Sequence, residues 1–325
     1  MKNELYTVVT GKDILTLSDE SSNPLIEDFL FEKDYVLLVA EEKAGKTIFA
    51  QQVACCLTSG TPFLGSLEVP KPVDVWYFAT EGKEDDLKDR FIRMSKGVDL
   101  NPDRLKLIPS RFRFNTREGR ECLRALVNRY QDCLPKVIIV DALYRAVKGS
   151  IKEDEVVNDF HHIMGTLSHE CDAAVILVHH FRKPTRDDTG TYVNRSDDDT
   201  FGSAFLKAAV DHCFWLEKCR KDSKDRILRC DTQRSGNIVD NMRLKLIQPD
   251  PLYFEAVSSM LEEKHKILTL MSAYKEGLSV SDIEFRSKIA RTTIYRTLKE
   301  LLNEGKIGKN GGKTKIYNII RGEYV

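Results

Sequence analysis

Two kinds of segment alternate along the first two thirds of the chain. Compact apolar runs, rich in β-branched residues and bounded by polar ones, occupy residues 34–40, 73–80, 136–143 and 173–180. Near-continuous apolar runs of this length are typical of strands buried on both faces of a parallel sheet. Helical patterns separate them, at residues 47–58, 83–95, 116–131 and 153–171. This alternation predicts a doubly wound α/β domain with a mostly parallel sheet.

The C-terminal part of the chain has a different pattern. It predicts three amphipathic helices, over residues 262–274, 279–289 and 290–307, with Ser281 in the capping position of the second. Two strands are then predicted around the turn Asn310-Gly311-Gly312. Three helices followed by a hairpin predict a small winged helix-turn-helix domain.

Composition and charge fit a protein of two domains. The 325 residues are 42% hydrophobic and 31% charged, with 50 Lys+Arg against 50 Asp+Glu, as in ordinary soluble proteins. Basic charge is nevertheless concentrated at residues 285–321, which hold ten Lys/Arg and two Glu. Prolines 249 and 251 mark residues 246–261 as a boundary. We therefore expect one domain over residues 1–255 and another over 262–325.

Nothing in the sequence predicts a membrane protein or a secreted one. No apolar run approaches the roughly 20 residues of a membrane span, and the start "MKNELYTVVTGKD" has no apolar core before a cleavage site. The eight cysteines lack paired short spacings. These features predict a cytoplasmic protein without a membrane partner.

The stretch "AEEKAGKT" at residues 40–47 ends as phosphate-binding loops do, in Gly45-Lys46-Thr47. Ala40 replaces the first glycine of the usual motif, and Glu41 and Glu42 follow it. The setting is favourable, because the stretch follows a predicted buried strand and opens a helix. We therefore expect it to bind ATP, with weakened hydrolysis or a need for a partner left open.

Each part of this loop has an expected task. Backbone N–H groups at the helix start would surround the phosphates, which makes the nucleotide-binding residues Lys43, Ala44, Gly45, Lys46, Thr47 and Ile48. Lys46 would reach the β- and γ-phosphate oxygens, and the Thr47 hydroxyl would ligate Mg²⁺. Asp141, at the end of the run "KVIIVD", would be the second magnesium anchor, although an aspartate there could also serve only as a cap.

Two further strand ends carry candidate chemistry. Glu81 in "YFATEGKEDD" could activate the attacking water, or could simply belong to the acidic cluster at the positive end of the next helix. His179 and His180 end the run "ILVHH" and could be ordinary polar residues facing a loop.

In these stretches the sequence resembles the RepA-type branch of RecA-like P-loop ATPases, hexameric helicases of plasmid and phage replication. The resemblance runs from about residue 24 to 236, through "PLIEDFLFEKDYVLLVAEEKAGKT", "SGTPFLG", "ATEGKEDDLKDRF", "IIVDAL" and "ILVHH". It implies that Glu81 is catalytic, that Asp141 holds magnesium and that His180 senses the γ-phosphate.

The same resemblance implies a residue that acts in a neighbouring subunit. In "LRCDTQRSGN", Arg234 stands where related helicases place an arginine that reaches the neighbour's γ-phosphate, while Thr232 replaces an expected lysine. A surface arginine in a turn is the competing interpretation, and Arg229, Lys224 and Arg226 are nearby alternatives.

DNA contacts are expected in two places. In the family a loop after the paired histidines touches single-stranded DNA; here residues 181–205 carry Arg182 and Lys183 but also five aspartates, so an ordinary surface loop is equally compatible. The third C-terminal helix could enter the major groove of duplex DNA, with the hairpin on phosphates. Its candidate residues are Arg291, Thr292, Thr293, Tyr295, Arg296, Lys299, Lys309, Lys313 and Lys315. Winged helices also serve as protein-docking modules.

The sequence therefore favours a DNA-dependent, helicase-like ATPase that uses ATP and Mg²⁺. It would form a homo-oligomer, expected to be a hexamer, and act on DNA of a plasmid, virus or mobile element. A recombination mediator or loader that uses ATP as an assembly switch is one alternative. A nucleotide-binding regulator with little hydrolysis is another. The sequence identifies no primase or loader partner.

Overall fold

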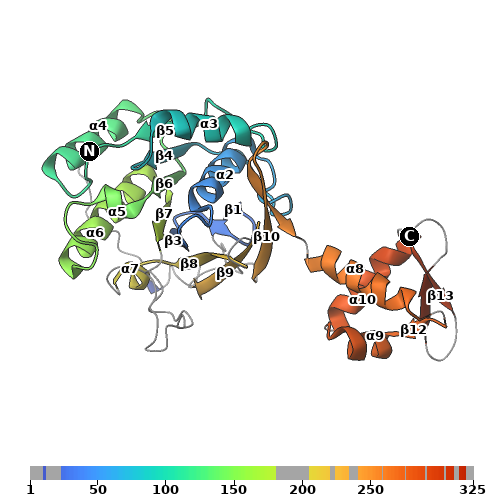
Figure 1. The fold of residues 1–325 in the computed structure, drawn as a ribbon. Coiled ribbons are helices and arrows are strands. Elements are labelled where there is room, and N and C mark those ends of the chain that lie inside the picture. Colours follow the sequence, from blue (N-terminus) through green and yellow to red (C-terminus); the bar gives the residue numbers. More distant parts are fainter. Residues whose placement is uncertain are drawn as a thin grey trace, which may run out of the picture. The chain divides into compact units, whose positions relative to one another are not determined.

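The computed structural model describes residues 10–11, 23–180, 205–219, 224–233, 241–257, 259–274, 276–289, 291–303, 305–310 and 315–319. The chain divides into two compact units, Met1–Ala256 and Val257–Val325 (Figure 1). None of the helices in the described part of the chain has the length and apolar character of a membrane span.

Among the described residues, the first unit is built on a nine-stranded sheet with the order β11-β10-β9-β8-β3-β7-β6-β4-β5. The strands β8 to β5 in this order are parallel, whereas β9 runs antiparallel to both β8 and β10. In chain order the strands are β3 (Tyr35–Ala40), β4 (Val75–Ala79), β5 (Leu105–Pro109), β6 (Val137–Asp141), β7 (Ala174–His180), β8 (His212–Lys218), β9 (Asp225–Gln233), β10 (Met242–Ile247) and β11 (Tyr253–Val257).

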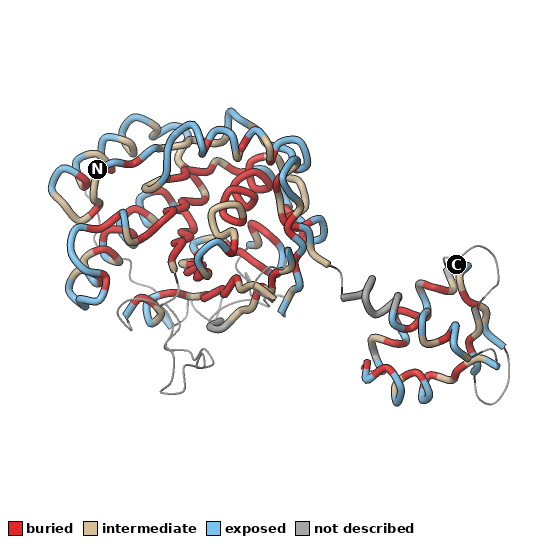
Figure 2. The backbone as a smooth tube through the Cα atoms, viewed as in Figure 1, coloured by how far each residue is buried: buried red, intermediate tan, exposed pale blue. Residues whose placement is uncertain are grey.

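Helices cover both faces of this sheet, because alternate strand residues point to opposite sides. Leu38 packs towards α2 (Lys46–Ser59) and α3 (Glu84–Met94). Leu37 packs towards the other face, which carries α4 (Arg117–Arg129), α5 (Leu143–Ala146), α6 (Asp154–Cys171) and α7 (Phe205–Ala208). Figure 2 shows the buried strands between helices whose outer sides are exposed. The predicted doubly wound, mostly parallel α/β fold is confirmed.

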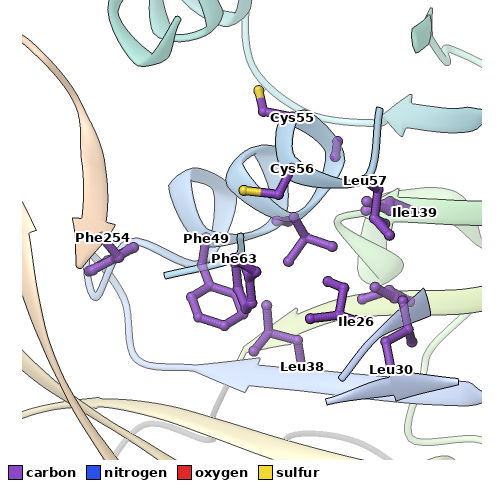
Figure 3. Close-up of a cluster of buried hydrophobic side chains, with 14 of the residues drawn as sticks. Ile26, Leu30, Leu38, Phe49, Cys55, Cys56, Leu57, Phe63, Ile139 and Phe254 are labelled. Atoms are coloured by element: carbon purple, nitrogen blue, oxygen red, sulfur yellow. The ribbon is translucent and has the colours of Figure 1, made fainter. Parts of the chain in front are cut away.

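The core on the α2 side extends beyond the parallel strands. Phe49 of α2 packs with Phe63 and Phe254, and the ribbon of β11 brings Phe254 to this cluster (Figure 3). The two-stranded sheet of β1 (Pro24–Ile26) and β2 (Leu30–Phe31) closes the same core. The segment 246–261, which the sequence marks as a boundary, contains the point where the two units divide. It also contains β11, which is a strand of the central sheet.

The second unit has its own core and its own small sheet. Its elements are α8 (Ser259–Ser272), β12 (Leu278–Ser279), α9 (Val280–Ser287), α10 (Arg291–Asn303), β13 (Ile307–Asn310) and β14 (Ile316–Ile319). The strands follow the order β12-β14-β13 with antiparallel pairing. Ile283 of α9 and Ile294 and Leu298 of α10 are buried together at its centre.

The expected capping residue of α9 is wrong. Ser279, not Ser281, precedes the helix: its hydroxyl accepts a hydrogen bond from the Asp282 N–H (3.2 Å), and the Asp282 carboxylate accepts one from the Ser279 N–H (3.0 Å). Both serines have an acid three residues later, Asp282 for Ser279 and Glu284 for Ser281, so the spacing of a capping box alone did not distinguish them. Ser281 lies in the first turn and is exposed.

Candidate nucleotide-binding site

The carboxyl ends of four parallel strands bring the candidate residues to one edge of the sheet. Ala40 at the end of β3 pairs with His180 of β7, and Asp141 of β6 pairs with Ala79 of β4. The segments that follow β3 and β4 carry Lys46 and Glu81. This edge is where ligands of open α/β sheets bind.

The first position of the loop does not need a glycine. Ala40 still belongs to β3, paired with His180 on one side and Leu216 on the other. The left-handed backbone comes later, at Lys43 (φ 60°) and at Gly45 (φ 102°), the N-cap of α2. The sharp turn is therefore made by residues 43–45, and the missing glycine is not at a position of positive φ.

The start of α2 offers backbone N–H groups to an anion. No side chain caps the helix and its first turn holds no acidic residue, so the positive end of the helix is not neutralised from within. Glu42 and Lys43 are exposed on the outer side of the loop. Such a helix start is suited to bind phosphate.

A buried arginine supports the loop from behind. The Nε of Arg226 on β9 donates a 2.7 Å hydrogen bond to the carbonyl oxygen of Ala44, and the residue is 5% exposed. Burial lowers the pKa of this guanidinium, an effect opposed by nearby charges that include Glu41. The Arg226 side chain therefore binds the loop of its own chain, which argues against Arg226 as the residue that reaches a neighbouring subunit.

Strand β11 supports the same loop through Phe254. The side-chain amide of Gln52 donates to the Phe254 carbonyl and accepts from the Phe254 N–H, each at 2.7 Å. A Cβ on Gly45 would lie 2.7 Å from the Phe254 ring. Gly45 is therefore required both by its φ angle and by this close approach.

Asp141 has the surroundings of a magnesium anchor. The residue is 3% exposed; its Oδ2 accepts a 2.7 Å hydrogen bond from the Tyr77 hydroxyl, and its Oδ1 has no hydrogen-bond partner among the described residues. Burial raises the pKa of Asp141, while the Tyr77 and Thr47 hydroxyls and the charge of Lys46 lower it. A buried carboxylate oxygen beside a threonine hydroxyl is a donor set that suits Mg²⁺.

Glu81 is held between two polar groups. Its Oε1 lies 3.6 Å from the Lys46 ammonium, and its Oε2 accepts a 2.6 Å hydrogen bond from the hydroxyl of Tyr144. The Lys46 side chain is 12% exposed and that of Glu81 26%. An acid that is this close to the phosphate loop and still reachable by water is placed as a general base would need to be.

His180 completes the group. Burial, reinforced by the positive charge of Lys46, lowers the pKa of its imidazole, which keeps the ring neutral near pH 7. A neutral ring keeps one N–H donor. Its ring centroid lies 5.4 Å from that of Tyr144, in an edge-to-face contact.

Sequence reasoning did not find Tyr77, Thr80 or Tyr144. The Thr80 hydroxyl donates a hydrogen bond to the Ala142 carbonyl (2.7 Å) and accepts one from the Ala142 N–H (2.8 Å), which ties the end of β4 to that of β6. A hydroxyl inside the apolar run "VWYFAT" was an available signal for Tyr77, because buried hydroxyls find partners. Nothing local distinguished Tyr144.

The expected DNA-contacting residues divide between described and undescribed parts of the chain. In the second unit Arg291, Tyr295, Lys299, Lys309 and Lys315 are exposed and Thr293 is half-buried. Arg291 also forms a 3.3 Å ion pair with Glu284. The side chains of Thr292, Arg296 and Thr232, and the residues Arg182, Lys183, Arg234 and Lys313, lie outside what the structure describes.

Solved structures with a similar fold include a replicative helicase and an ATPase domain. A DnaB-like replicative helicase matches 75% of this chain with a TM-score of 0.55 and 12% identity. The match covers 66% of the helicase, slightly less than two thirds of its length. A separately solved ATPase domain matches with a TM-score of 0.54 and 13% identity, covering 76% of this chain and 95% of that one. No curated protein sequence matches the chain.

The first unit therefore shares the α/β fold of these structures, and it carries a strand–loop–helix segment, β3 to α2, at the edge of its sheet. A family model described as an AAA domain matches residues 4–186, more than half of the sequence, and the chain belongs to this family.

Proposed function

We propose that the protein is a DNA-dependent, helicase-like ATPase that works as a homo-oligomeric ring. One observation carries the proposal: Lys46, Glu81, Asp141 and His180 meet at the carboxyl edge of the sheet, around the open start of α2. Support for the helicase-like part comes from the fold, which a replicative helicase and a further ATPase domain share.

Each residue has a role in this proposal. The N–H groups of residues 43–48 hold the polyphosphate, and Lys46 turns from Glu81 to the β- and γ-phosphate oxygens. Thr47 and Asp141 would hold Mg²⁺, which neutralises charge on the phosphates when bound. Glu81 takes the proton of the attacking water, and the N–H of His180 contacts the γ-phosphate.

For the second unit we propose a winged helix that binds duplex DNA through α10. The order of three helices and a small antiparallel sheet supports this, as do the exposed Arg291, Tyr295 and Lys299 on α10. Arg234 as the residue acting in a neighbouring subunit, and Arg182 and Lys183 as contacts to single-stranded DNA, are proposed from the sequence alone.

The test of the nucleotide site is phosphate release from ATP and Mg²⁺ by purified protein. We expect turnover by the wild type, rising with single-stranded DNA, and no turnover by Lys46→Ala. Lys71→Ala, which removes an exposed lysine outside the site, is the matched control and keeps the wild-type rate. Wild-type phosphate release from Lys46→Ala would disprove the assignment.

Strand displacement separates helicase action from the second candidate, a DNA-loading ATPase. Thr232, standing where related helicases carry a lysine, favours that candidate. A helicase unwinds a forked duplex in an ATP-dependent way. A loader would hydrolyse ATP and assemble on DNA without releasing a strand.

A further inference from the structure

Tyr144 occupies a central place at the edge of the sheet. It lies three residues after Asp141, in the short helix α5 that follows β6. In the sheet β6 stands between β4 and β7, whose ends lead to Glu81 and His180. A residue that follows the middle strand can therefore contact groups from both of its neighbours.

The side chain of Tyr144 makes both contacts. Its hydroxyl donates a 2.6 Å hydrogen bond to Glu81 Oε2, and its ring meets the ring of His180 edge to face, at 5.4 Å and 65°. The Arg145 guanidinium lies 5.2 Å from the centroid of the same ring. Burial and the hydrogen bond to Glu81 raise the pKa of Tyr144, so the phenol keeps its proton and remains a donor.

The other polar contact of Glu81 cannot persist in the proposed reaction. Glu81 Oε1 faces the Lys46 ammonium at 3.6 Å, and Lys46 must turn to the phosphates when a triphosphate enters. Packing alone does not fix a carboxylate whose side chain is 26% exposed. The bond from Tyr144 can persist, because its donor lies on α5 and not in the phosphate loop.

We propose that Tyr144 is a positioning residue: its hydroxyl holds Glu81 in the orientation needed to take a proton from the attacking water. This inference rests on the proposed ATP hydrolysis and assigns a role within the same site. A base must be held within a narrow range of geometry to act, and a charge-assisted hydrogen bond provides that restraint.

The first measurement compares Tyr144→Phe with the wild type in steady-state ATP hydrolysis. This variant removes the hydroxyl and keeps the ring against His180, so the fold is retained, which thermal unfolding verifies. We expect kcat to fall about 10- to 100-fold, as for loss of one hydrogen bond to a charged group, while KM for ATP stays within about twofold. Tyr130→Phe, a ring that packs on Trp76 away from the site, is the matched control and leaves both constants unchanged.

A double-mutant cycle shows whether Tyr144 acts through Glu81. In single-turnover hydrolysis we expect Tyr144→Phe to cause no further loss in a Glu81→Gln background, because an acid that no longer serves as the base needs no positioning. If the two effects multiply, or if Tyr144→Phe changes KM and leaves kcat alone, the positioning role is excluded.

The outcomes also distinguish this inference from the function on which it rests. A wild type that hydrolyses ATP, a Lys46→Ala variant that does not, and a Tyr144→Phe variant at the wild-type rate would overturn the role of Tyr144 and leave the ATPase intact. A wild type that binds ATP and never hydrolyses it would overturn both.

Discussion

In the parallel part of the sheet, from β8 to β5, the candidate site residues lie at strand ends or in the segments that follow them. In the antiparallel part, from β9 to β11, Arg226 and Phe254 lie behind the phosphate loop and contact its backbone. The parallel part carries Asp141, Glu81 and His180, which we propose as the magnesium ligand, the general base and the hydrogen-bond donor. The antiparallel part holds the shape of a loop that has only one glycine.

This difference explains how the loop tolerates an unusual sequence. A glycine-rich loop reaches its shape through backbone freedom, whereas this one has a left-handed lysine, Lys43, and a carbonyl fixed by Arg226. Substitutions in the parallel part should therefore affect the chemical step. Those in the antiparallel part should affect stability and nucleotide affinity.

The largest expected effect comes from Glu81→Gln. The amide cannot accept the proton of the attacking water, so we expect kcat to fall about 10²- to 10⁴-fold, the usual contribution of a general base. Affinity for a non-hydrolysable ATP analogue, measured by calorimetry, should be retained. A variant that hydrolyses normally would remove Glu81 from the chemical step and weaken the comparison at its parallel side.

An intermediate effect is expected for Gly45→Ala. The new Cβ would face the Phe254 ring at 2.7 Å in a backbone of φ 102°, so we expect the free energy of unfolding to drop by about 2–4 kcal/mol. Gly65→Ala is the matched control, because Gly65 has φ 78° and no atom within 4 Å of the added Cβ. It should lose only the conformational part, about 1 kcal/mol. Equal losses in chemical denaturation would mean that Phe254 does not support the loop.

The smallest effect is expected for Arg226→Met. Methionine fills much of the same volume but leaves the Ala44 carbonyl without its donor, so KM for ATP should rise about tenfold with little change in kcat. Arg243→Met, on the neighbouring strand β10, is the matched control. It removes an ion pair with Asp225, but the Arg243 side chain is 47% exposed, so KM and kcat should both stay unchanged. A fall in kcat at constant KM would contradict the division between the two parts of the sheet.

The parallel strands were predictable because burial on both faces leaves continuous apolar runs. The runs at 34–40, 136–143 and 173–180 became β3, β6 and β7 with ends shifted by no more than two residues. β10 was not predicted, although its sequence "MRLKLI" alternates exposed charged residues with buried leucines, which is the pattern of a strand with one buried face. β5 was also missed, because "LKLIP" is only partly buried and short.

Candidate site residues were predictable where the chemistry is local and not where a contact joins distant segments. Lys46, Thr47 and Asp141 follow from a strand end and a helix start. The bond from Tyr144 to Glu81 spans 63 positions and that from Arg226 to Ala44 spans 182, so only the folded chain shows them. Arg226 was one of the alternatives for the residue that reaches a neighbouring subunit, and nothing in the sequence indicated its hydrogen bond to the Ala44 carbonyl.

The pair of hydrogen bonds between Gln52 and Phe254 has a consequence for how the protein is made. The two residues are 202 positions apart, so the loop leaves the ribosome long before the strand that supports it. Until that strand emerges, the nascent chain carries a phosphate loop without its native backing. Any product of early termination that lacks β11 would keep residues 40–47 and lose the support of Phe254.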